Sequence, residues 1–165
     1  MPDLMDLNDL IVSIERLEVA EIEDIARRLY REIYVTSGRY GICKAHDGES
    51  VYFWEDRFEH AFYTSSNRIR YPDRKDKLDL ERVKRIRWIK EIIAGQIPGT
   101  GCWLTPSPSG GGRPLNRLYV LLSDSYVIWL EPRLSGGWKF STAYKARLKD
   151  VQRYCSLGKR IWVQK

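Results

Sequence analysis

The stretch that decides the fold is "RLYVLLSDSYVIWLEP", Arg117–Pro132. Two apolar runs of strand-forming residues flank a short Asp-Ser turn, and this pattern predicts a β-hairpin. Two neighbouring stretches extend the pattern: "GGWKFSTAY" (136–144) predicts a further strand, and "GCWLT" (101–105) is a candidate strand inside a Gly- and Pro-rich segment. The second half of the chain is therefore expected to form an antiparallel sheet.

The first half of the chain is dominated by helical patterns. Apolar residues follow helical spacing over 5–17 and 20–34, and "DLERVKRIRWIKEIIAG" (79–95) predicts a helix that begins after Asp79 and ends before Gly95. Between them, "RYGICKA" and "SVYFW" predict a hairpin, "EDRFEHAFYTS" predicts a short helix, and 66–78 predicts a basic loop. Helices followed by strands indicate an α+β fold, with N-terminal helices packed on an antiparallel sheet of about four strands. We expect an N-terminal helical segment, residues 1–40, joined to a body, residues 41–165, in one compact unit.

The charge is unevenly distributed along the chain. The 165 residues carry a net charge of +6, but residues 1–24 have a net charge of −7 and residues 25–165 a net charge of +13. A basic globular body favours polyanionic partners, of which nucleic acid is the commonest. The acidic start is either a solvated helical face or a segment that lies against the basic surface.

Cysteine usage and hydropathy bear on the compartment and on cofactors. The three cysteines occur without a CxxC motif and predict reduced thiols in an intracellular protein. Cys43 and His46 have half of a zinc-site spacing without a second half, so neither a metal nor another cofactor is expected. The acidic N-terminus is unlike a signal peptide, and no apolar run is long enough to span a bilayer. We therefore expect no membrane association and a cytoplasmic location, either in the producing cell or after delivery into a target cell.

The helix over 79–94 carries two informative arginines. On a helical wheel Arg82 lies within the apolar arc and Arg85 at its border, three residues apart and so on one side, whereas Lys84 faces water. An arginine directed toward a sheet must be paired or must line a cleft that receives an anion. An internal ion pair with Glu131 or Asp124 and an anion site are equally consistent with the wheel.

The histidine in "FEHAF" and the hydroxyl groups of "FSTAY" are further candidates. His60 lies between aromatic residues just before a basic segment, where it is either a packed residue or an acid–base group. Thr142 and Tyr144 should point to the same face of a strand beside Ser141, and their hydroxyls could bind a phosphate. Thr and Tyr are also ordinary strand residues.

Four motifs in this order, "FEHAF", "RVKRIRWIKEII", "YVLLSDSYVIWLE" and "WKFSTAY", resemble the barnase–EndoU–colicin–RelE superfamily of metal-independent ribonucleases, most closely its phage- and toxin-associated branch. The resemblance covers roughly residues 50–150. It implies helices packed on a four-stranded antiparallel sheet that carries the active site. It also implies five catalytic residues: His60, Arg82, Arg85, Thr142 and Tyr144.

The function that follows is a metal-independent, toxin-like endoribonuclease. The ribose 2′-hydroxyl would attack the adjacent phosphate and give a 2′,3′-cyclic product, with His60 as acid or base and the arginines stabilising the phosphorane. Substrate contacts would come from Ser141, Lys84 and Trp138, with Ser65 and Ser66 as extra candidates. The implied partners are RNA, with transfer RNA as a candidate substrate, and an immunity or antitoxin protein.

Two alternatives share the same residues. A nucleic-acid-binding module without catalysis would use the basic surface and the exposed tryptophans. A phage protein-interaction domain would instead dock partners through the acidic N-terminus and the Gly- and Pro-rich loop over 95–116.

Overall fold

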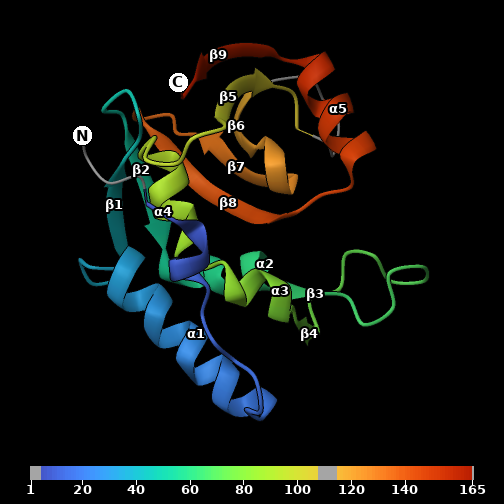
Figure 1. Ribbon diagram of the computed structural model, residues 1–165. Helices are drawn as coiled ribbons and strands as arrows, with labels where there is room; N and C mark the ends of the chain where they lie inside the picture. The colour runs from blue at the N-terminus through green and yellow to red at the C-terminus, as the bar shows by residue number, and fades with distance from the viewer. Residues whose placement is uncertain (1–4, 108–114, 165) are drawn as a thin grey trace.

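The computed structural model describes residues 5–107 and 115–164, and Figure 1 shows an α+β architecture built on one large mixed sheet. The strand order in this sheet is β1-β2-β8-β7-β6-β5-β9, and a separate small sheet pairs β3 with β4. The strands are β1 (Tyr40–Lys44), β2 (Ser50–Trp54), β3 (Tyr63–Thr64), β4 (Lys77–Leu78), β5 (Thr100–Thr105), β6 (Asn116–Leu121), β7 (Tyr126–Pro132), β8 (Trp138–Lys145) and β9 (Lys159–Val163).

The helices cover both faces of the large sheet. They are η1 (Leu7–Leu10), α1 (Val19–Tyr34), η2 (Glu55–Arg57), α2 (Phe58–Phe62), α3 (Leu80–Lys84), α4 (Trp88–Ile93), η3 (Leu122–Asp124) and α5 (Leu148–Leu157). In Figure 1, α1 and α5 lie at opposite ends of the molecule with the sheet between them. Among the described residues, none of the helices combines the length and apolar character needed to cross a bilayer.

Two apolar cores follow from the alternation of side chains along the central strands. The larger core joins one face of the sheet, including Tyr119, Ile128 and Phe140, to α1, α2, α3 and α4. The smaller core lies on the opposite face, where Trp129 packs with Tyr154 of α5. The sheet is therefore buried on both sides, which explains why β6 and most of β7 read as nearly continuous apolar runs.

The central strands agree with the sequence, but the sheet is larger than expected. The hairpin of β6 and β7, the strands β5 and β8, and the hairpin of β1 and β2 are all present. The prediction of about four antiparallel strands is wrong, because the sheet has seven strands and β2 pairs with β8 in parallel. The basic C-terminal segment also forms the edge strand β9, which pairs with β5. Its helix α5 covers the second face, so the helices are not confined to one face.

The N-terminal segment is less helical than its spacing indicates. Residues 20–34 are confirmed as helix within α1, but residues 5–17 form only the short 3-10 helix η1 followed by extended chain. Two contacts hold this chain to the helices of the larger core: Val12 N–H donates to the Lys84 carbonyl (3.0 Å), and the Trp88 indole donates to the Leu7 carbonyl (3.2 Å). The left-handed backbone of Arg16 (φ 66°) then turns the chain into α1.

The expected helix over 79–94 is divided into α3 and α4. Asp79 caps α3 as predicted, with its carboxylate accepting from the backbone of Glu81 and Arg82. The division has a defined cause. The buried Tyr34 hydroxyl donates to the Ile86 carbonyl (2.5 Å) and accepts from Lys90 N–H (3.0 Å), two groups that would bond each other in a continuous helix.

Candidate functional site

The candidate site lies along the edge of β8 beyond its short contact with β2. The parallel pairing joins Val51 to Trp138 and Tyr52 to Lys139, and β2 ends soon afterwards at Trp54. Arg57 of η2 and Arg82 of α3 donate hydrogen bonds to Ser141 and Thr142 of β8, and α2 packs close to the same strand. Polar groups of β8 are thereby available to residues from three different segments.

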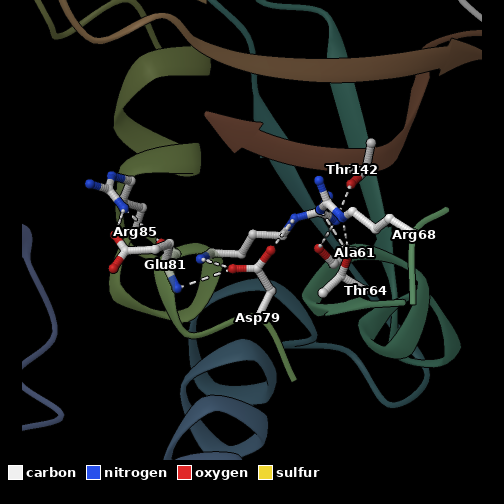
Figure 2. Close-up of polar contacts among 8 residues, drawn as sticks. Ala61, Thr64, Arg68, Asp79, Glu81, Arg85 and Thr142 are labelled. Atoms are coloured by element: carbon white, nitrogen blue, oxygen red, sulfur yellow. Dashed lines mark hydrogen bonds and ion pairs between the residues drawn. The ribbon is translucent and has the colours of Figure 1, made fainter. Parts of the chain in front are cut away.

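Arg57 and Arg82 bind this edge of β8 directly. Arg57 donates to both the Ser141 carbonyl (Nε, 3.0 Å) and the Ser141 hydroxyl (Nη2, 2.8 Å). Arg82 donates from Nη1 to the Ala61 carbonyl (3.1 Å) and to the Thr142 hydroxyl (3.5 Å), contacts that Figure 2 shows. Two guanidinium groups thus lie next to hydroxyl groups of one strand.

Arg82 is a largely buried cation. Its side chain is 10% exposed, and its Nε lies 3.2 Å from the Asp79 carboxylate, close enough for an ion pair. That buried Nε–H makes no hydrogen bond with the described part of the chain. Burial lowers the pKa of the guanidinium, which nonetheless stays protonated at neutral pH. Arg57 has a carboxylate of its own in Glu131 (3.7 Å), so the surplus positive charge that would favour a further anion comes from Arg68 and Lys75.

His60 is presented at the same place by α2. Its ring is exposed and makes no hydrogen bond with the described residues. Partial burial and the positive charges of Arg57, Lys75 and Arg82 lower its pKa to about 4, while Glu131 acts in the opposite direction. The imidazole is therefore neutral near pH 7 and has a free nitrogen lone pair.

Two more cations reach this site from the loop between β3 and β4. The pairing of Thr64 with Lys77 closes the loop and brings Lys75 near Arg57 and Arg82. Partial burial and the charges of Arg82, Arg68 and Arg57 lower the pKa of Lys75. Arg68 donates to the Thr64 hydroxyl from Nη2 (2.8 Å), as Figure 2 shows.

Sequence reasoning missed Arg57, Arg68 and Lys75. Arg57 had a usable signal, because it precedes His60 by three residues and residues at that spacing share a side of a helix. Arg68 and Lys75 had none, since they belong to an aperiodic loop whose course depends on the pairing of β3 with β4.

A pocket of about 450 Å³ adjoins Arg82. Its lining combines cations, acids and one aromatic ring: Arg68, Asp79, Glu81, Arg82, Tyr144, Lys145, Ala146, Arg147 and Asp150. His60 and Arg57 are not among these residues. Arg82 links the two places, because it lines the pocket and its charge also acts on the His60 imidazole. The pocket can accept a polar group that extends from an anion bound at Arg82.

Arg85 and Lys84 lie elsewhere than Arg82. The 13%-exposed Arg85 donates from Nη1 to the carbonyl (2.8 Å) and the carboxylate (2.9 Å) of Glu81, and it stacks over Trp88 (5.1 Å). Figure 2 shows Arg85 and Glu81 apart from Thr142 and Arg68. Lys84 also pairs with Glu81 (3.1 Å). The expectation that Arg82 and Arg85 share a side fails because the helix ends at Arg85.

The three strand residues of "FSTAY" differ in availability. Ser141 is buried and accepts from Arg57, and Thr142 is within reach of Arg82. Tyr144 lies beneath the Arg82 guanidinium (5.0 Å to the ring), but its hydroxyl accepts from the Trp129 indole (3.2 Å). Burial raises the pKa of that phenol. Tyr144 therefore offers a ring rather than a free hydroxyl.

Trp138 belongs to a different cluster at the other end of β8. Its indole N–H donates to Glu49, and Arg117 lies over its ring (4.7 Å). Arg117 is itself only 5% exposed and pairs with Asp47 (2.9 Å). The structure therefore does not bring Trp138 together with His60.

Ser65 and Ser66 support the loop between β3 and β4. The Ser65 hydroxyl donates to the Tyr71 carbonyl, and Ser66 binds Asp76 through its backbone N–H (2.9 Å) and its hydroxyl (2.8 Å). Two other expected features lie partly outside the described residues: the acidic N-terminus at residues 1–4, and the Gly-rich part of the 95–116 loop at residues 108–114.

Within residues 5–107 and 115–164, no group of three or more His, Cys, Asp or Glu side chains is arranged to hold a metal ion. In comparisons with known proteins, no family model, curated protein or solved structure matches this chain. The resemblance to the barnase–EndoU–colicin–RelE superfamily therefore rests on the short motifs alone and stays a prediction.

Proposed function

We propose that this protein is an endoribonuclease that cleaves RNA without a metal ion at the β8 edge. The observation that carries the proposal is a neutral imidazole, His60, next to the cations Arg57, Lys75 and Arg82. A phosphodiester needs this combination: a base for the 2′-hydroxyl and fixed positive charge for the oxygens of the phosphorane. The basic net charge supports a polyanionic substrate.

The proposed reaction balances without an added reagent. His60 takes the proton of the ribose 2′-hydroxyl, and the 2′-oxygen forms a bond to phosphorus. The bond from phosphorus to the 5′-oxygen breaks, and the leaving oxygen takes a proton from the Lys75 ammonium, whose lowered pKa makes it a stronger acid. Arg82 and Arg57 stabilise the phosphorane, with Thr142 as a hydrogen-bonding neighbour. The products are a 2′,3′-cyclic phosphate and a free 5′-hydroxyl.

The phosphate also helps the base. An anion bound between the cations offsets the charges that lower the pKa of His60, so that pKa rises toward its ordinary value near 6.5 in the complex. A base with a pKa near neutrality is more effective than one near 4.

The first test is incubation of the purified protein with total RNA in EDTA, beside the variant His60→Ala. The imidazole is exposed and makes no hydrogen bond to the described residues, so this variant should fold normally, as thermal unfolding would verify. Cleavage that persists in EDTA and disappears in the variant supports the proposal. Equal cleavage by both proteins would remove His60 from the mechanism.

The second candidate function is RNA binding without cleavage. It is favoured by the exposed basic loop between β3 and β4, which is larger than a catalytic site alone requires. If neither protein cleaves RNA but both bind it with strong salt dependence, this candidate replaces the ribonuclease. If neither binds RNA, both candidates are excluded.

A further inference from the structure

The loop between β3 and β4 projects away from the body of the protein. Figure 1 shows it extending well beyond the helices, with β3 and β4 at its base. Residues 66–76 carry four cations (Arg68, Arg70, Arg74 and Lys75) against Asp73 and Asp76, a net charge of +2, and Lys77 follows in β4. The loop is therefore a protruding segment of concentrated positive charge.

Hydrogen bonds give this loop a defined shape. Asp76 closes its base by accepting both the backbone N–H and the hydroxyl of Ser66. Farther out, Tyr71 N–H donates to the Asn67 carbonyl (2.8 Å), and Arg70 N–H donates to the Asn67 side chain (3.1 Å). The projecting side chains are consequently presented by a folded turn, which reduces the entropy lost on binding.

The outer part of the loop combines apolar and cationic groups. Ile69 is 99% exposed, and Tyr71 is 39% exposed. The Arg70 and Arg74 guanidinium groups lie over the Tyr71 ring, at 5.3 and 4.1 Å from its centroid. Exposed apolar and stacked guanidinium groups beside positive charge suit unpaired bases and phosphates of single-stranded RNA.

The two ends of the loop connect this surface to the candidate site. Arg68 lines the pocket next to Arg82, and the charge of Lys75 acts on His60. A polyanion that binds at the site can therefore extend along the loop and stay in contact with positively charged side chains over its whole length. An acidic protein could meet the charge, but it would not account for a loop whose two ends lie at the cations around His60, where the proposed cleavage takes place.

We propose that residues 66–76 form an RNA-binding arm that holds the strand beside the phosphate to be cleaved. The arm rests on the proposed ribonuclease function, because its direction is defined by the site at its base. Arg70 and Arg74 bind phosphates, Tyr71 and the stacked guanidinium groups contact bases, and Ile69 packs against an unstacked base. Arg68 and Lys75 join the arm to the site.

The test measures RNA affinity with cleavage prevented by His60→Ala. In this background, the arm variant Arg70→Gln/Arg74→Gln is compared with the control Arg28→Gln/Arg31→Gln, which removes the same charge from exposed positions of α1. The ligand is an unstructured RNA of about 20 nucleotides, titrated over a range of salt concentrations. A second arm variant, Ile69→Ser/Tyr71→Ser, keeps the charge and the backbone hydrogen bonds.

We expect the arm variant to raise the Kd about tenfold or more and to reduce the salt slope by about two, as for two lost phosphate contacts. The control should change the Kd by less than about threefold, and the Ile69→Ser/Tyr71→Ser variant should weaken binding about fivefold with an unchanged salt slope. Equal RNA affinity of the arm variant and the control variant would overturn the proposal that residues 66–76 bind RNA.

The arm and the ribonuclease can fail separately. If protein that retains His60 cleaves RNA but the arm variant and the control bind RNA with equal affinity, the proposal of an RNA-binding arm is wrong and the proposal of a ribonuclease is supported. If no cleavage occurs but the arm variant alone loses affinity, the binding surface stands and the ribonuclease is wrong.

Discussion

Arg82 and Arg85 are three residues apart, yet their guanidinium groups bind different surroundings. Arg82 reaches Thr142 and Ala61 at the β8 edge, and Arg85 folds back on Glu81. The reason is that α3 ends at Lys84: Arg85 is its C-cap, with φ −104° and ψ 16°, and its guanidinium binds Glu81 of the preceding turn. This divergence leaves Arg82 as a candidate site residue and gives Arg85 local contacts only.

The two arginines should therefore differ in their effect on catalysis. We expect Arg82→Ala to lower kcat for RNA cleavage about 10²- to 10³-fold, because it removes a cation aimed at the phosphorane. Arg85→Ala is the matched control and should retain kcat within about twofold. Single-turnover cleavage assays on both variants measure this difference, and comparable losses in both would contradict the assignment of Arg82.

The pKa of His60 is directly measurable. NMR titration of the ring protons should give a pKa of about 4 in the free protein. Lys75→Gln should raise this pKa because it removes a nearby positive charge, and Glu131→Gln should lower it further. A His60 pKa that is unchanged in both variants would show that these side chains do not act on the imidazole.

The same pKa fixes the sign of two pH dependences. Because the base must be neutral and the Lys75 ammonium protonated, kcat/KM should rise with pH through about 4, level off, and fall again at alkaline pH where Lys75 loses its proton. The folded-state pKa of His60 lies below the unfolded value near 6.5, so the unfolded chain binds more protons between these values. His60 therefore contributes stability that is lost as pH falls from about 6.5 to about 4, and a comparison of wild type with His60→Ala by urea unfolding at several pH values would detect it.

The Tyr34 hydroxyl should contribute substantially to stability. Tyr34→Phe leaves the buried Ile86 carbonyl and Lys90 N–H without their partner, which costs about 1–3 kcal/mol in the free energy of unfolding. Tyr40→Phe is the control, because its hydroxyl makes no hydrogen bond with the described residues, and it should cost less than about 0.5 kcal/mol. Urea unfolding measures both, and equal midpoints would indicate that the two helices are separated for another reason.

Trp138 should affect folding rather than cleavage. Its ring lies beneath Arg117 in the cluster that includes Glu49, well along β8 from Thr142. We expect Trp138→Leu to lower the unfolding midpoint and to keep kcat within about twofold. A large rise in KM with unchanged stability would restore Trp138 as a substrate contact.

Much of the fold could be read from local patterns. The hairpin of β6 and β7 has a continuous apolar run on each side of a polar turn, and Asp79 caps α3 where the sequence indicated. These features depend on neighbours within a few residues, which a single sequence displays. The edge strand β9 was missed because its partners on β5 are about 60 residues away and its own residues are mostly exposed.

The sequence by itself determined the α+β class, the basic body, the central strands and the candidates His60, Arg82 and Thr142, because each follows from residue type and short-range spacing. Only the tertiary structure decided which candidates meet. The pairing of β2 with β8 stops early and leaves an edge for Arg57 and Arg82, the pairing of β3 with β4 brings Lys75 to His60, and Tyr34 separates α3 from α4. Each of these depends on contacts between residues far apart in the chain, and such contacts leave no periodic pattern in a sequence.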